Sequence, residues 1–176
     1  RFANFSFNTA ASDKISELQL YVQSSDYTFN LHVEPKKSKV VLNGGNAVIA
    51  WGPNGANSTH WSIPSARTSG TLTLGTNKTL ELDPEHSFTW YDHQITHGVP
   101  KNFTFFEVHF PNPGVRASIW AYDRPDSDES FQFATVRLGE ETQLVLPYTW
   151  EVDWDNVWVS PATNYTYPQF WTLKFE

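Results

Sequence analysis

The feature that constrains this chain most is a short-range alternation of apolar and polar residues that recurs along its length. In residues 27–33 the larger apolar side chains fall on one face: Tyr27, Phe29, Leu31 and Val33. This period of two is typical of a half-buried β-strand. No segment offers three clean turns of helical period, and only residues 11–21 have a composition that would allow a short helix to begin. The chain is therefore predicted to be all-β.

Such segments recur along the chain, broken by turn-forming residues, and predict an antiparallel lipocalin-like barrel or sandwich. We expect strands at residues 18–22, 27–33, 40–42, 47–51, 59–63, 67–74, 79–82, 87–94, 103–110, 115–122, 131–138, 142–146, 148–152, 158–160 and 170–175. The segments on either side of Pro111 and Gly114 are expected to pair as a hairpin. No linker splits the chain into two autonomous domains, so residues 1–176 are expected to form a single β region.

Charge and composition exclude several classes of partner. Acidic residues outnumber basic ones by 19 to 12, which gives a formal net charge of −7. We therefore expect no nucleic-acid partner, which would need a basic face, and no binding to an anionic membrane surface. The chain has no cysteine, and the spacing of its central histidines matches no standard zinc pattern, so no metal site is expected. These histidines are His86, His93, His97 and His109.

Glycosylation motifs indicate the cellular compartment in which the protein is made. The chain carries acceptor sites of the form Asn-x-Ser/Thr at Asn4, Asn57, Asn77, Asn102 and Asn164. Each lies beside turn-forming residues or at a strand edge, where a glycan has room to project into water. These sites predict a glycoprotein of the secretory pathway. Because the first residue is Arg1 and no signal peptide follows, we expect the numbering to begin inside a longer precursor.

The most unusual segment is Trp90-Tyr91-Asp92-His93-Gln94. In a strand, Trp90, Asp92 and Gln94 share one face, and Tyr91 and His93 share the other. Aromatic neighbours that remove water from Asp92 would raise the pKa of its carboxyl, which suits a proton donor. His93 could act as an acid or a base near neutral pH. The alternative is that these polar residues only fix the strand register.

Tryptophan is abundant, with eight residues in the chain. Aromatic side chains near the polar segment are candidates for the walls of a cavity that holds a flat apolar molecule. The candidates are Trp61, Trp90, Tyr91, Trp120, Tyr122 and Trp158. The alternative is an aromatic core that needs no ligand.

A family resemblance rests on a series of landmarks between about residues 27 and 173. They are Leu42-Asn-Gly-Gly45, Trp61-Ser-Ile-Pro-Ser65, Thr68-Ser-Gly-Thr-Leu-Thr-Leu74, Asp92-His93-Gln94, Trp158-Val-Ser-Pro161 and Tyr167-Pro168-Gln-Phe-Trp171. In their order they resemble the two-domain lipocalin-like family of carotenoid 1,2-hydratase (hydroxyneurosporene synthase) and AttH proteins. Fungal kievitone hydratase-like and Diels–Alderase-like proteins are similar in architecture. In that family a Gly follows the Asp-His-Gln element closely, whereas here residues 95–97 come before Gly98.

The resemblance implies that the chain is part of a two-barrel protein. Residues 1–65 would be about the end of a first lipocalin-like half, and residues 66–176 most of a second, truncated half. A companion segment or chain of the same precursor would complete the fold.

The resemblance also implies a cofactor-free enzyme that binds a hydrophobic terpenoid or polyketide. We expect a Diels–Alderase-like cyclase, in which the cavity orients the reacting groups and Gln94 or His93 polarises a carbonyl. The alternative is a hydratase, in which Asp92 protonates a double bond and His93 activates water. A third possibility is a non-catalytic carrier of a small apolar molecule.

Overall fold

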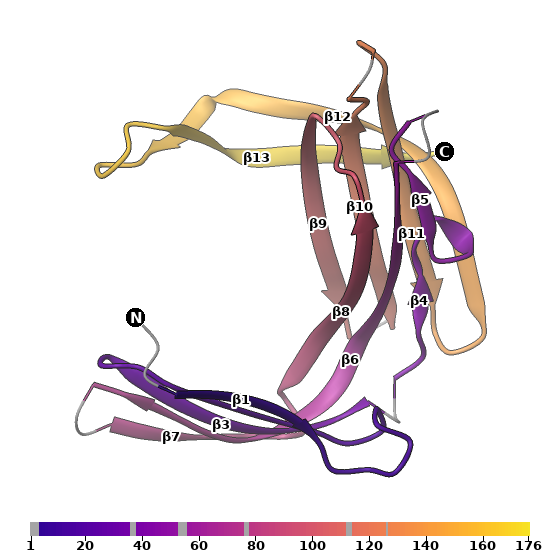
Figure 1. Ribbon diagram of the computed structural model, residues 1–176. Helices are drawn as coiled ribbons and strands as arrows, with labels where there is room; N and C mark the ends of the chain where they lie inside the picture. Colours follow the sequence, from indigo (N-terminus) through magenta and orange to yellow (C-terminus); the bar gives the residue numbers. More distant parts are fainter. Residues whose placement is uncertain (1–3, 36–37, 53–55, 76–77, 112–113, 126) are drawn as a thin grey trace.

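The computed structural model describes residues 4–35, 38–52, 56–75, 78–111, 114–125 and 127–176, and it folds into two antiparallel sheets (Figure 1). The first sheet contains β1 (Asn4–Thr9), β2 (Leu18–Gln23), β3 (Tyr27–Glu34), β4 (Val41–Leu42), β5 (Val48–Ala50), β6 (Asn57–Leu74), β7 (Lys78–Leu82) and β8 (Phe88–His97). The second contains β9 (Asn102–Phe110), β10 (Val115–Asp123), β11 (Ser130–Leu138), β12 (Thr142–Val159) and β13 (Thr166–Phe175). This arrangement confirms the predicted antiparallel all-β class.

The long strand β6 is the axis of the first sheet. One edge of β6 pairs with β3, β4 and β5, and the other pairs with β7 and β8. The sequence predicted two strands here, at residues 59–63 and 67–74, whereas the structure has one. The register with β8 shifts between Ile63 and Ala66, where Pro64 offers no N–H to the ladder. Strand β6 thus runs through the position at which a boundary between two halves was placed, and that boundary stays a prediction.

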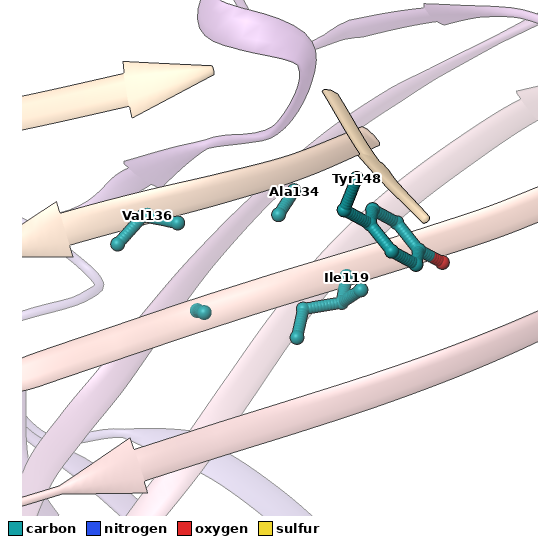
Figure 2. Close-up of a cluster of buried hydrophobic side chains, with 5 residues drawn as sticks. Ile119, Ala134, Val136 and Tyr148 are labelled. Carbon is teal, nitrogen blue, oxygen red and sulfur yellow. The ribbon is translucent and has the colours of Figure 1, made fainter. Parts of the chain in front are cut away.

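The second sheet follows chain order from β9 to β13. Residues Phe103 to Phe110 of β9 lie opposite Val115 to Tyr122 of β10, which confirms the predicted hairpin. Strand β12 pairs with β11 along its first part and with β13 along the rest, so β12 and β13 leave the sheet as a long two-stranded arm (Figure 1). Figure 2 shows a core cluster of this sheet, in which Ile119, Ala134, Val136 and Tyr148 pack together.

The two sheets meet along β6 and β10. Trp51, which follows β5, packs against Trp120 of β10, with ring centroids 5.6 Å apart, and edge-on against Tyr122 at 4.8 Å. The short 3-10 turn η2 (Asn43–Gly45) also links the sheets, because the backbone N–H of Gly44 donates to the hydroxyl of Thr135 on β11. The whole chain forms an open curl, with β1, β3 and β7 at one end and the arm at the other (Figure 1).

Other local predictions were also wrong, and the three strands predicted at residues 142–146, 148–152 and 158–160 are the single strand β12. Strand β1 was not predicted, although it pairs with β2 over its whole length. The possible helix at residues 11–21 is instead a turn followed by β2, because Leu18 and Val22 bury their side chains against the sheet. Over the described part of the chain, no helix has the length and apolar character needed to cross a membrane.

Candidate active site

A hollow of about 250 Å³ opens between the facing sides of the two sheets. Strands β6 and β8 supply polar side chains to its wall, and β9 and β10 supply aromatic rings. The lining residues are Trp51, His60, Asp92, Gln94, Thr96, Val99, Pro100, Phe103, Phe105 and Trp120. The alternation of β8 brings Asp92 and Gln94 to the same wall, as the sequence predicted.

Asp92 is held by donors from two strands. The indole N–H of Trp90 donates to its Oδ1 at 2.9 Å, and Nε2 of His60 lies 3.3 Å from the same oxygen. Ser62 faces Asp92 across the β6–β8 ladder. Burial by itself would raise the pKa of Asp92, but the polar neighbours His60, Glu107, Ser62 and Trp90 outweigh burial and hold this pKa well below its ordinary range. The prediction that the pKa of Asp92 is raised is therefore wrong.

The proton sits instead on Glu107 of β9, which hydrogen-bonds the carboxylate of Asp92. The side chain of Glu107 as a whole is exposed, but its carboxyl meets Asp92 between the sheets. Partial burial of the carboxyl, together with the hydrogen bond to Asp92 and its negative charge, raises the pKa of Glu107 to about 8. Two adjacent carboxyls thus divide into a base, Asp92, and an acid, Glu107, at neutral pH.

His60 completes the polar cluster. Its side chain is 1% exposed, and its ring lies 5.6 Å from Trp120 and 6.1 Å from Phe105, measured between centroids. Neither ring nitrogen of His60 makes a hydrogen bond among the described residues, and Nε2 approaches Oδ1 of Asp92 at 3.3 Å as a contact between a histidine and a carboxylate. The aromatic rings thus exclude water from one side of His60, while Asp92 lies on the other.

The other predicted residues of this segment lie on the opposite face of β8. His93 stacks on Trp61, with centroids 5.0 Å apart and planes 10° apart, and Tyr91 packs against Trp61 at 5.8 Å. Trp61 and Tyr91 border the core cluster around Leu18 and Val33. The structure therefore does not bring His93, Tyr91 and Trp61 to the hollow, because the pleat turns successive side chains to opposite faces.

The remaining predicted aromatic residues are Trp90, Trp120, Tyr122 and Trp158, and only some of them lie at the hollow. Trp120 lines it, and Trp90 contributes the hydrogen bond to Asp92. Tyr122 lies next to it in the aromatic cluster with Trp51, and its hydroxyl donates to the carbonyl of Ala50 at 2.9 Å. Trp158 belongs to the β12–β13 arm, where it faces Tyr167 and is half exposed.

A larger hollow of about 410 Å³ lies at the other end of β8 and β9, and no predicted site residue lines it. Its cations are already matched by acids. Arg67 pairs with Glu34 and Glu85, and Arg116 lies 3.5 Å from Glu140. The arginines of this hollow are therefore paired, and Asp92 lines the aromatic hollow instead.

Sequence reasoning missed Glu107 and His60. Glu107 follows Phe103 and Phe105 on one face of β9, and a lone carboxyl in an aromatic row needs a partner if it is to be buried. His60 stands between Ser58 and Ser62 on one face of β6, a run of polar side chains in a strand whose neighbours are buried. Both sequence patterns were visible, but neither shows that Asp92 is the partner. A contact between residues of different strands cannot be read from the sequence of either strand alone.

The predicted glycosylation sites differ in accessibility. Asn4, Asn102 and Asn164 are exposed. Asn57 is partly buried within β6, where it lies opposite both Ala50 and His97, and Asn77 lies outside the described residues.

The comparisons with known proteins agree with this architecture. No family model matches the chain. Kievitone hydratase from Fusarium solani subsp. phaseoli is 32% identical over 167 residues, which are 92% of this chain and 46% of that protein. The dehydratase asqC from Emericella nidulans is 32% identical over 173 residues, which are 96% of this chain and 48% of that protein. The crystal structure of kievitone hydratase from Nectria haematococca superposes with a TM-score of 0.87 and 30% identity, over 98% of this chain and 53% of that one. The chain is thus similar to kievitone hydratase and to asqC over about half the length of each.

A second solved structure shows the same fold at greater distance. A protein from Nitrosomonas europaea assigned as AttH superposes with a TM-score of 0.78 and 16% identity, over 97% of this chain and 52% of that one. The chain spans about half the length of the curated relatives it matches. The resemblance seen in the sequence is thereby confirmed, as is the lipocalin-like all-β fold.

Proposed function

We propose that this protein adds water to, or removes water from, a carbon–carbon double bond of a small apolar molecule. The observation that carries the proposal is the carboxyl pair: an ionised Asp92 lines the aromatic hollow, and a protonated Glu107 lies beside Asp92. Two of the relatives are named a hydratase and a dehydratase, and these are the two directions of a single reaction. One acid and one base serve both directions, with their roles exchanged.

The two carboxyls account for every proton in the reaction. For hydration, Glu107 gives its proton to one alkene carbon, and the oxygen of a water molecule bonds to the other carbon. The proton that this water loses passes to Asp92, beside which His60 lies. The pair then holds one proton as before, and it returns to Glu107 because Asp92 keeps the hydrogen bonds that stabilise its charge. Dehydration runs the same steps backwards.

The aromatic wall supports this chemistry. Protonation of an alkene leaves positive charge on carbon, and the faces of aromatic rings attract a cation. Trp120 and Phe105 line the hollow together with Asp92, and their ring centroids are 4.4 Å apart. The same rings limit the access of bulk water, so a single water molecule can be placed rather than many.

Cycloaddition, the preferred expectation from the sequence, stays a prediction, and the named relatives favour the hydratase alternative. An aromatic hollow with the amide of Gln94 on its wall suits a shape-driven cyclase, which would need no acid pair. Asp92→Asn separates the two reactions, because a hydratase should lose most of its activity and a cyclase should keep much of it.

The test uses kievitone, the compound in the name of the first relative, in water labelled with heavy oxygen. We expect the product to gain one labelled water. We expect Glu107→Gln to slow the reaction by about 10²–10⁴-fold, the usual contribution of a positioned acid. Glu141→Gln in an exposed turn is the matched control and should keep the rate. A product without labelled oxygen would exclude water addition to this compound, and unchanged kievitone together with tight binding would favour the carrier.

A further inference from the structure

The buried end of the aromatic hollow holds a tryptophan whose N–H has no acceptor. Trp51 is 1% exposed and lines the hollow, and its Nε1 makes no hydrogen bond with any residue that the structure describes. In contrast, the indole N–H of Trp90 donates to Oδ1 of Asp92 at 2.9 Å. The indole N–H of Trp120 donates to the hydroxyl of Ser118 at 3.1 Å. Of these three indoles, that of Trp51 is the one whose donor stays unmatched within the described part of the chain.

The packing of Trp51 explains its ring but not its N–H. The ring lies 5.6 Å from that of Trp120 and meets Tyr122 edge-on at 4.8 Å, measured between centroids. A phenylalanine could make both contacts, since they need only an aromatic ring. An indole N–H can only donate, and a buried donor without an acceptor destabilises a protein. The N–H of Trp51 is therefore suited to an acceptor atom that comes from outside the described chain.

His60 is a second buried polar group at the same end of the hollow. It is 1% exposed, and neither of its ring nitrogens makes a hydrogen bond among the described residues. Its ring lies 5.6 Å from that of Trp120, the same distance as the ring of Trp51, so both side chains pack against one indole. Nε2 of His60 approaches the carboxylate of Asp92 at 3.3 Å, which leaves Nδ1 as the nitrogen without a recorded partner. Two unmatched polar groups beside Trp120 thus mark a place where an oxygen-bearing group can be bound.

The shape of the hollow gives a bound molecule a direction. Val99 and Phe103 also line the hollow, and because they are 66% and 63% exposed they form its rim. Trp51 and His60 lie at its buried end. The volume of about 250 Å³ is slightly below the range of about 300–1,000 Å³ for pockets that enclose drug-sized ligands. A two-ring molecule, or one end of a larger one, therefore fits, and its leading atoms lie beside Trp51.

We propose that Trp51 is a substrate-binding residue whose indole N–H donates to an oxygen atom of the ligand, so that the hollow selects apolar ring compounds with a carbonyl or hydroxyl oxygen at the leading end. As a statement about the substrate this rests on the proposed function, but the binding itself needs no turnover. A carbonyl oxygen accepts from Trp51. A hydroxyl oxygen accepts as well, and its proton is available to Nδ1 of His60 when that nitrogen carries none. A hydrocarbon of the same shape leaves both buried groups unmatched and binds more weakly.

Matched probes test the hydrogen bond. 1-Tetralone and tetralin share one two-ring frame, but only the ketone carries an oxygen, and 1-tetralol carries a hydroxyl in its place. We expect Trp51→Phe to weaken the binding of 1-tetralone and 1-tetralol to the full chain by about 2–10-fold, the range for one net hydrogen bond. The dissociation constant of tetralin should stay the same. NMR titration measures all three constants.

Trp154→Phe is the matched control, because Trp154 lies on β12 outside the hollow and is 62% exposed. It should change none of the three dissociation constants. An equal loss for ketone and hydrocarbon in Trp51→Phe would assign the effect to ring packing and overturn the proposed hydrogen bond. Equal affinities of Trp51→Phe and the parent for every probe, or no binding of any probe to the parent, would overturn it as well.

The indole signal of Trp51 gives a second measurement that needs no variant. In the isotope-labelled parent chain we expect the indole proton of Trp51 to move downfield when 1-tetralone is added and to move less with tetralin. If Trp51→Phe fails to fold, as judged by circular dichroism, this comparison decides alone. An indole proton that moves equally with both probes, or with neither, would contradict the proposed contact.

Failure of the proposed function would look different from failure of this inference. The reaction of kievitone in water labelled with heavy oxygen is measured in parallel. Tighter binding of the ketone through Trp51, without any labelled water in the kievitone product, would reject the proposed function and still support the role of Trp51. Labelled product formed at the same rate by Trp51→Phe and the parent, with unchanged probe affinities, would support the function and reject that role.

Discussion

Asp92 and Glu107 come from strands of different sheets, yet their carboxyls share one proton. The difference between them is set by their neighbours. Asp92 accepts a hydrogen bond from Trp90 and lies beside His60 and Ser62, whereas Glu107 has its pKa raised by burial and by Asp92. Two carboxyls that would titrate alike in water are thereby assigned opposite roles.

The raised pKa of Glu107 has a cost in stability. Between the ordinary carboxyl pKa of 4.5 and about 8, the folded chain holds a proton that the unfolded chain releases. The ionisation of Glu107 therefore costs nothing below this pH window, and the free energy of unfolding falls as the pH rises through the window. Glu107→Gln cannot ionise, so we expect it to melt a few degrees higher than the parent at pH 9 and close to the parent at pH 4. A melting difference that is the same at both pH values would contradict the assignment of the proton to Glu107.

Among the elements, most strands could be predicted because alternation is a local property of the sequence. Strands β2, β3, β9 and β10 matched their predicted ranges closely. Partners across the two sheets could not be predicted, since nothing in the β8 sequence says that β9 will stand opposite it. Asp92 and Gln94 were therefore found, but Glu107 and His60 were not.

The pairing of β6 with β3 depends on a glycine. Gly70 has a φ of 128°, and a Cβ at this position would lie 2.1 Å from the carbonyl oxygen of Asn30. We expect Gly70→Ala to lower the free energy of unfolding by about 2 kcal/mol or more, because both the backbone and the neighbouring strand must shift. Urea unfolding measures the change.

Gly139→Ala is the control for the effect of backbone conformation alone. Gly139 has a φ of 59°, and no atom lies within 4 Å of the position that an added Cβ would occupy. A loss of about 1 kcal/mol is expected here. Equal losses in the two variants would show that close approach to β3 does not matter.

In the molecule as a whole, the open curl is what brings Asp92, with Glu107 beside it, to the wall of an aromatic hollow. The chain covers about half of its curated relatives, and a companion segment that completes the fold stays a proposal. Secretion stays a proposal too, and it makes a specific prediction. In a secretory host we expect glycans at the exposed Asn4, Asn102 and Asn164, but none at Asn57, which β5 and β8 flank.

Peptide mass mapping before and after enzymatic deglycosylation tests this pattern. Deamidation at the three exposed asparagines after glycan removal is the expected result. A fully unmodified chain from such a host would remove the support for secretion, and a glycan at Asn57 would contradict the pairing of β6 with both neighbours.

Whether the two carboxyls share a proton can be decided by an NMR titration of the Glu107 carboxyl in the isotope-labelled chain, with Asp92→Asn as the comparison. We expect Glu107 to titrate near pH 8 in the parent, and its pKa to fall toward an ordinary value once the negative charge beside it is removed. If Glu107 titrates near 4.5 in both proteins, the two carboxyls share no proton, and the proposed acid and base do not exist.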